Sequence, residues 1–139
     1  MPSRAWKILC VVVFTMSSSA WAQTRPANSK EPVSSGRRLS QWIADLKAPA
    51  PQTRNEAAYE LARMGADAAP AVPALIEALD DPIPAVRYPV TIALLEIGPA
   101  AKEAIPRLRQ MMDEEINDEI AASARRALKR IDPKAVPRQ

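Results

Sequence analysis

Side chains that could carry out catalysis are few in this sequence. It contains no histidine, and its one cysteine, Cys10, lies in an apolar run near the N-terminus. Nucleophilic and general-base catalysis most often use these two residue types. The sequence also lacks a glycine-rich phosphate loop and any ligand spacing typical of a metal site. We therefore predict a protein with no catalytic residue, no metal and no cofactor.

One acidic run has the residue types of a calcium site. Asp113, Glu114 and Glu115 are followed by Asp118 and Glu119. The run lacks the glycine and the alternating ligands of an EF-hand loop. Acidic side chains are stabilised near a helix N-terminus by its partial positive charge. We interpret the run as the start of a helix.

Two columns of charged residues recur at a constant step along the sequence. One column reads Lys47, Asp80, Asp113, and the other reads Arg54, Arg87, Ile120. The first copy thus lacks the acid and the third lacks the base. If each arginine pairs with the acid of the next copy, the pairs are Arg54–Asp80 and Arg87–Asp113, and the adjacent acids Asp81 and Glu114 are alternative partners within these pairs. Such pairs secure register between copies more than they add stability.

These columns belong to an internal repeat that begins near Ser40. Residues 71–80 align with residues 104–113 at an offset of 33 residues, the same step that separates Asp80 from Asp113. Three copies follow, at residues 40–72, 73–105 and 106–138. Repeats of this length are typical of solenoids, in which each unit buries its apolar face against its neighbours.

Each copy holds two helical patterns joined by a short break. The first helix begins at Ser40, Pro73 or Pro106, residue types that suit a helix start. The second helix ends at Gly65 or Gly98 in the first two copies, because glycine accepts the positive φ that stops a helix.

Pro89 lies where the second helix of the middle copy should already have begun. Proline lacks the backbone N–H and clashes with the preceding turn unless it lies in the first turn of a helix. We therefore expect residues 84–88 to form a separate or kinked turn, with the regular helix starting close to Pro89.

Short phrases recur in register between the copies. They include Asp80-Asp81-Pro82, Val86-Arg87 and the segment 94–100, and residues 54–65 contain a similar motif in the first copy. They resemble bacterial HEAT-like repeats of the short kind also found in phycobilisome lyases. The resemblance implies an all-α fold, a right-handed α-solenoid of three two-helix repeats over residues 40–135. The signatures of ankyrin and tetratricopeptide repeats, whose periods are similar, are absent.

The resemblance also places the functional surface on the face lined by the second helices. Tyrosine, isoleucine and arginine side chains at outward positions are candidate anchors and clamps for a partner. These candidate residues are Tyr59, Arg63, Tyr88, Ile92, Arg125 and Arg126. The alternative is that both tyrosines only cover neighbouring helices.

The N-terminal residues have the three parts of a signal peptide. A basic start with Arg4 and Lys7 precedes the apolar run 8–16 and the small-residue site Ala20-Trp21-Ala22. This run of nine residues is far shorter than the roughly 20 apolar residues that span a bilayer. We predict cleavage of residues 1–22, no stable membrane anchor afterwards, and a periplasmic or secreted location.

Residues 23–39 contain two prolines, three serines, one glycine and no aromatic residue. Such a composition buries too little surface to offset the entropy of ordering. We predict a flexible linker that joins the signal peptide to the repeat domain at 40–135.

Charge argues against nucleic acid as a partner. Removing Arg4 and Lys7 with the signal peptide lowers the formal net charge from +3 to +1, whereas nucleic-acid binding needs a concentrated cationic surface. We predict an exported scaffold that binds a protein or peptide partner. Two alternatives remain: a lyase-like or isomerase-like activity, implied by the resemblance, and a nucleic-acid-binding helical repeat.

Overall fold

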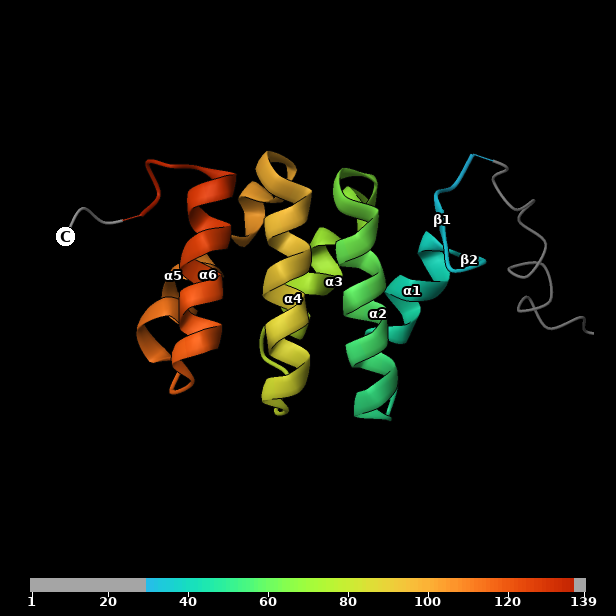
Figure 1. Cartoon of the computed structure of the whole chain (residues 1–139), viewed down its shortest axis with the longest axis horizontal. Helices are drawn as coiled ribbons and strands as arrows, with labels where there is room; N and C mark the ends of the chain where they lie inside the picture. Colours follow the sequence, from blue (N-terminus) through green and yellow to red (C-terminus); the bar gives the residue numbers. More distant parts are fainter. Residues whose placement is uncertain (1–29, 137–139) are drawn as a thin grey trace, which may run out of the picture.

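The computed structural model describes residues 30–136, so the predicted signal peptide lies outside the described residues. The elements in order are β1 (Val33–Ser34), β2 (Arg37–Arg38), α1 (Leu39–Asp45), α2 (Pro51–Met64), η2 (Gly65–Ala71), α3 (Val72–Ala78), α4 (Pro84–Ile97), η3 (Gly98–Ala104), α5 (Ile105–Glu114) and α6 (Asp118–Ile131). The second helices α2, α4 and α6 run side by side in one layer, and the shorter α1, α3 and α5 form the other (Figure 1). The expected α-solenoid of three two-helix repeats is confirmed.

Local sequence sets where the second helices begin. Pro51 and Pro84 lie in the first turn of α2 and α4, where the missing N–H of proline costs no intrahelical bond. Asn117 precedes α6, and its side-chain oxygen accepts the backbone N–H of Glu119 at 3.0 Å and of Ile120 at 3.2 Å. Each second helix therefore begins at a residue that favours a helix start.

Glycine ends α2 and α4. Gly65 has φ 56° and ψ −130°, and Gly98 has φ 70° and ψ −138°. This region of backbone space is open to glycine without the strain that a Cβ would add. The predicted stops at both glycines are confirmed, and η2 and η3 carry the chain on to the next first helix.

The core lies between the two helical layers. Leu61, Leu94 and Leu128 occupy equivalent places in α2, α4 and α6, and all three are fully buried. The sequence separation between Leu94 and Leu128 is one residue larger than that between Leu61 and Leu94. The third repeat therefore has one additional residue ahead of α6. The constant repeat step is wrong there: Ile120, expected in the arginine column, is instead the buried equivalent of Val86.

Pro89 lies inside α4, which is one continuous helix, so the expected separate turn at residues 84–88 is wrong. A proline at this position leaves the carbonyl oxygen of Ala85 without its helical donor. The side-chain amide of Asn55 on α2 donates to that oxygen at 2.5 Å. The neighbouring repeat thus supplies the hydrogen bond that the proline removes.

Strands β1 and β2 form an antiparallel hairpin that contacts α1 and α2. The prediction of a flexible linker up to Leu39 is therefore wrong for these residues, and Leu39 itself is buried. The Glu60 carboxylate on α2 accepts hydrogen bonds from the hydroxyls of Ser34 at 2.6 Å and Ser35 at 2.8 Å. The indole N–H of Trp42 donates to the backbone oxygen of Ser34 at 3.1 Å. The composition of the segment gave no sign of this order, because its partners lie on other elements.

Candidate functional site

Arg54 links the first repeat to the second through Asp81. Its Nε and Nη2 donate to the two carboxylate oxygens at 2.5 and 3.1 Å, a bidentate geometry that fixes both groups. Its Nη1 donates to the backbone oxygens of Ala48 at 2.9 Å and Pro49 at 3.0 Å, in the loop of its own repeat. The two side chains are 14% and 6% exposed, so the ion pair is largely shielded from solvent.

Arg87 repeats this arrangement between the second and third repeats. Its Nε and Nη2 donate to the Glu115 carboxylate at 2.7 and 2.9 Å, and its Nη1 donates to the backbone oxygen of Asp81 at 2.8 Å. The Asp81 and Glu115 side chains also accept the backbone N–H of Ile83 at 2.9 Å and of Asn117 at 3.2 Å. Each acid therefore ties the start of a second helix to the arginine of the preceding repeat. We call these two ion pairs the ladder.

The predicted direction of pairing matches the structure, but the preferred acids Asp80 and Asp113 are wrong: the first pair uses the alternative Asp81, and the second uses Glu115 rather than Asp113 or Glu114. Asp80 instead accepts a hydrogen bond from Nε of Arg107 at 2.8 Å, and Asp113 is exposed. The acids that pair, Asp81 and Glu115, each lie just ahead of the N-cap of a second helix. The additional residue ahead of α6 shifts the third-repeat acid by one position, which a constant repeat step could not show.

The two ends of the array omit the ladder group that would have no neighbour. The acid position of the first repeat holds Ala48, and the arginine position of the third repeat holds Ala121. An unpaired charge at either end would be partly desolvated without compensation. The ladder is therefore complete with two pairs.

The ladder carboxylates ionise more readily than usual. The pKa of Glu115 is lowered from its ordinary value of 4.5, mainly because Arg87 donates hydrogen bonds to it. Burial by itself would raise the pKa of Asp81, but hydrogen bonds from Arg54 and from the N–H of Ile83, together with nearby positive charge, outweigh burial and lower it. The hydrogen bond to Asp81 raises the pKa of Arg54. Both pairs are thus charged at neutral pH and act as inter-repeat connections.

A hollow of about 290 Å³ opens on the face formed by the second helices. Tyr59 of α2 and Tyr88 of α4 both line it, with Asn55, Asn117 and Ile120 among the other lining residues. Tyr59 is 45% exposed, whereas Tyr88 is half-buried against the core. A tyrosine presents an apolar ring and a polar tip, which suits it to contact a partner. The two predicted anchors therefore share one hollow, which we call the tyrosine hollow.

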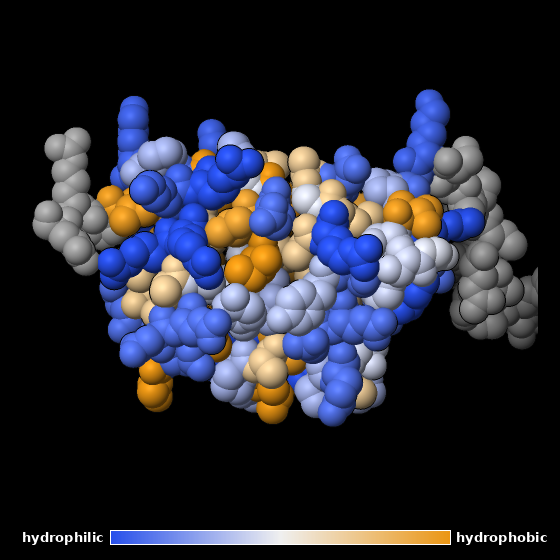
Figure 2. All heavy atoms as spheres, in the orientation of Figure 1, coloured by the Kyte–Doolittle hydropathy of each residue, from blue (hydrophilic) through white to orange (hydrophobic). Residues whose placement is uncertain are grey.

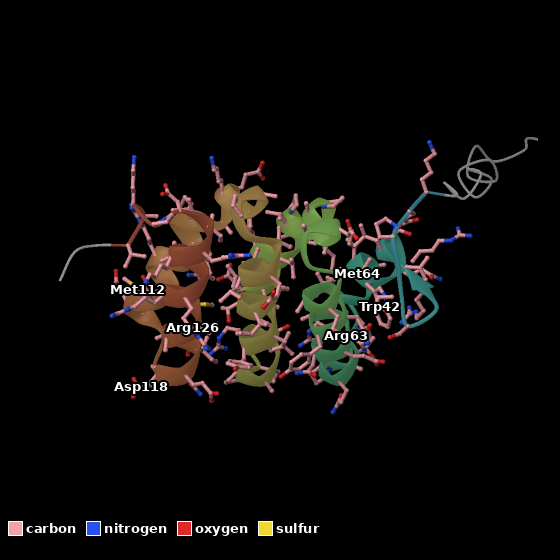
Figure 3. The ribbon with its side chains drawn as sticks, turned by 45° about the horizontal axis from the view of Figure 1, so that its top comes forward. Trp42, Arg63, Met64, Met112, Asp118 and Arg126 are labelled. Carbon is pink, nitrogen blue, oxygen red and sulfur yellow. The ribbon has the colours of Figure 1, made fainter. Side chains whose placement is uncertain are left out.

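The other predicted binding residues lie outside the tyrosine hollow. Ile92 of α4 is half-buried against the core. Arg63 pairs with Glu60 at 3.1 Å within α2, and Arg125 and Arg126 are exposed on α6. Figure 3 shows Arg63 and Arg126 on the two outer helices of the layer, with α4 between them. The structure thus brings the tyrosines together and spreads the other four residues over the three second helices.

A second hollow of about 330 Å³ lies at the loop edge between the second and third repeats. Its lining includes Asp81, Arg87 and Glu115, whose polar atoms are already used in the ladder. Ile116, next to these residues, is 96% exposed, and apolar atoms project at this edge in Figure 2. Sequence reasoning missed Ile116, for which the signal was a single large apolar residue within an acidic loop.

Residues 30–136 hold no group of three or more His, Cys, Asp or Glu side chains placed to bind a metal ion. In the same part of the chain, no helix combines the length and the apolar character needed to cross a bilayer. The tyrosine hollow is lined by two aromatic rings and one carboxylate, while the side-chain amides of Asn55 and Asn117 beside them form hydrogen bonds to the backbone.

Comparison with known proteins identifies the repeat. The family described as HEAT repeats matches residues 39–129. Among solved structures, the crystal structure of an engineered protein from a structural genomics consortium is similar, with a TM-score of 0.58 and 22% sequence identity. The match covers 67% of this chain and 44% of that chain, so this chain spans less than half the length of its structural relative. A search of curated proteins gives no match. At 22% sequence identity, this structural similarity supports the fold only.

Proposed function

Because the chain belongs to the HEAT-repeat family, we propose that it is a non-catalytic, exported scaffold that binds a protein or peptide partner through the face formed by α2, α4 and α6. HEAT repeats typically act as protein-interaction scaffolds. Stacked repeats offer an extended surface that a partner can follow over several units. We further assign the repeats to the short bacterial kind that the sequence resembles.

The observation that carries this proposal is the tyrosine hollow. Tyr59 and Tyr88 come from neighbouring repeats and line the same depression. Tyr59 leaves 45% of its surface in solvent, although a buried tyrosine ring contributes well to the free energy of folding. Tyrosine is one of the residue types enriched among those that contribute most to binding at protein interfaces. No observation singles out a lyase-like activity or a nucleic acid as partner, so neither is proposed.

Crosslinking tests the binding role. The tagged full-length chain is produced in its own organism, crosslinked and purified, and the captured proteins are identified. We expect a reproducible partner that is lost with Tyr59→Ala, because the anchor in the hollow is removed. The matched control is Ile116→Ser, which removes an exposed apolar side chain at the loop edge and should leave capture unchanged. Equal capture by wild type and Tyr59→Ala would contradict this face as the binding site.

Export is tested separately. The support is the basic start, the apolar run and the site Ala20-Trp21-Ala22 in the sequence. We expect intact-mass analysis of the exported protein to show a chain that begins at Gln23. A chain that retains residues 1–22 would overturn the proposed cleavage, whatever the outcome of the crosslinking.

A further inference from the structure

The second half of α6 carries a dense group of exposed positive charges. We call it the α6 cationic patch, and its members are Arg125, Arg126, Lys129 and Arg130. Within residues 30–136, none of the four forms an ion pair with a carboxylate. Figure 2 shows hydrophilic side chains gathered over this part of the surface. The patch stands out from the near-neutral charge of the rest of the chain.

Helix stability does not account for the patch. Positive charges in the last turn interact favourably with the helix dipole, which explains Lys129 and Arg130. Arg125 and Arg126 lie earlier in α6, beyond the reach of that effect. They also form two like-charged pairs with i,i+4 spacing, Arg125 with Lys129 and Arg126 with Arg130, which oppose helix formation. An uncompensated local cost of this kind is typical of a functional surface.

The other second helices neutralise their arginines. In α2, Arg63 pairs with Glu60 at 3.1 Å, and in α4, Arg87 pairs with Glu115 at 2.7 Å. Arginines on α2 and α4 thus have carboxylate partners within the described chain. The α6 cationic patch lacks its counter-charges within the described chain, so an external group with negative charge fits it.

Apolar side chains adjoin the patch across the second-helix face. Tyr59, Ile92 and Arg126 occupy equivalent places on α2, α4 and α6, once the additional residue ahead of α6 is counted. Leu95 on α4 likewise corresponds to Lys129, and it is partly buried against the core. Figure 2 shows apolar atoms on α4 next to the hydrophilic surface of α6. A ligand on the patch therefore meets apolar surface beside the charges.

We propose that the α6 cationic patch and the adjoining apolar surface of α4 bind an acidic peptide segment of a partner protein, one in which apolar side chains alternate with carboxylates. This inference rests on the proposed scaffold function and names the chemistry of the partner. Arginine is well suited to bind such an acidic segment, because its planar guanidinium binds a carboxylate through two parallel hydrogen bonds. A nucleic acid fits less well, because the four charges are confined to one half of one helix, whereas nucleic-acid affinity comes from neutralising phosphates along an extended backbone.

Fluorescence anisotropy with the full-length mature chain tests the partner chemistry. The probe is a short labelled peptide of glutamate, leucine and serine. Comparison probes are the same peptide with lysine in place of glutamate, and a short DNA duplex. The test variant is Arg125→Gln/Arg126→Gln, since glutamine keeps helix propensity. The control is Lys102→Gln/Lys134→Gln, which removes the same charge at exposed positions outside α6.

We expect the wild-type chain to bind the glutamate probe more tightly than either comparison probe. The affinity should fall about tenfold in Arg125→Gln/Arg126→Gln, as for the loss of two solvent-accessible ion pairs. The control should stay within about twofold of wild type. Failure of the wild-type chain to bind the glutamate probe, a change below about threefold in the test variant, or tighter binding of the lysine probe or the DNA would overturn the inference.

The crosslinking experiment separates this inference from the function on which it rests. If Arg125→Gln/Arg126→Gln captures the same partner as wild type while Tyr59→Ala loses it, the scaffold function stands and the acidic-segment inference fails. If the wild-type chain captures no partner and binds no probe, both fail.

Discussion

Replacing Arg87 with alanine should lower the free energy of unfolding more than the loss of an ordinary surface charge does. The change leaves the Glu115 carboxylate, which is 8% exposed, without its cationic partner. Losing an exposed ion pair costs about 0–1 kcal/mol, and truncating one member of a fully buried pair costs about 3–5 kcal/mol. Arg87 is 17% exposed, so its pair lies between these limits. We expect a loss of about 2 kcal/mol.

Urea denaturation followed by circular dichroism measures this loss. A double-mutant cycle of Arg87→Ala with Glu115→Ala should show a coupling energy of about 1–2 kcal/mol, because the two side chains share hydrogen bonds. The matched cycle with Asp113→Ala, an exposed acid near the same loop, should show coupling below about 0.5 kcal/mol. Stronger coupling to Asp113 than to Glu115 would refute the register derived for the ladder.

The pH dependence of stability tests the Arg87–Glu115 ion pair independently. The pKa of Glu115 is lowered in the folded state from its ordinary value of 4.5, so ionisation of this group stabilises the fold. That contribution is fully present above the ordinary pKa and is lost as pH falls through the lowered folded pKa. Glu115→Gln should therefore reduce stability near neutral pH and flatten its decline in acid. Equal pH profiles for wild type and variant would contradict an ionised pair.

Three further changes test the packing of the array. Leu94→Ala should cost about 2–5 kcal/mol in urea denaturation, because Leu94 is fully buried in the middle helix; a loss below about 1 kcal/mol would place it outside the core. Asn55→Ala should cost about 1 kcal/mol by leaving the Ala85 carbonyl without a donor. In a Pro89→Ala background, which restores the helical N–H, the cost of Asn55→Ala should shrink, and an unchanged cost would refute the compensation. Gly98→Ala should cost about 1–3 kcal/mol, because alanine is strained at a φ of 70°; melting at the wild-type temperature would contradict this.

Local sequence predicted the helical repeat because its signals act over a few residues. The predicted stops at Gly65 and Gly98 are the ends of α2 and α4 in the structure, whereas the start of α4 at Pro84 was not predicted. The two helical patterns in each copy predicted the helices that contain Leu61 and Leu94, and both side chains are fully buried in the structure. The recurrence of Arg54 and Arg87 predicted that arginines would pair with acids of the next repeat. The resemblance to HEAT-like repeats placed Tyr59 and Tyr88 among the outward candidates; in the structure Tyr59 is exposed and Tyr88 is partly buried against the core.

Only the tertiary structure decided which groups meet across elements. The ladder acids are Asp81 and Glu115 because they precede the helix starts, and one additional residue in the third repeat hid that equivalence from a fixed period. The continuity of α4 through Pro89 depends on an amide from another repeat. The hairpin ahead of α1 depends on hydrogen bonds to Glu60 of α2. Each of these contacts joins residues that are far apart in the sequence, whereas the helix signals read from the sequence act within one or two turns.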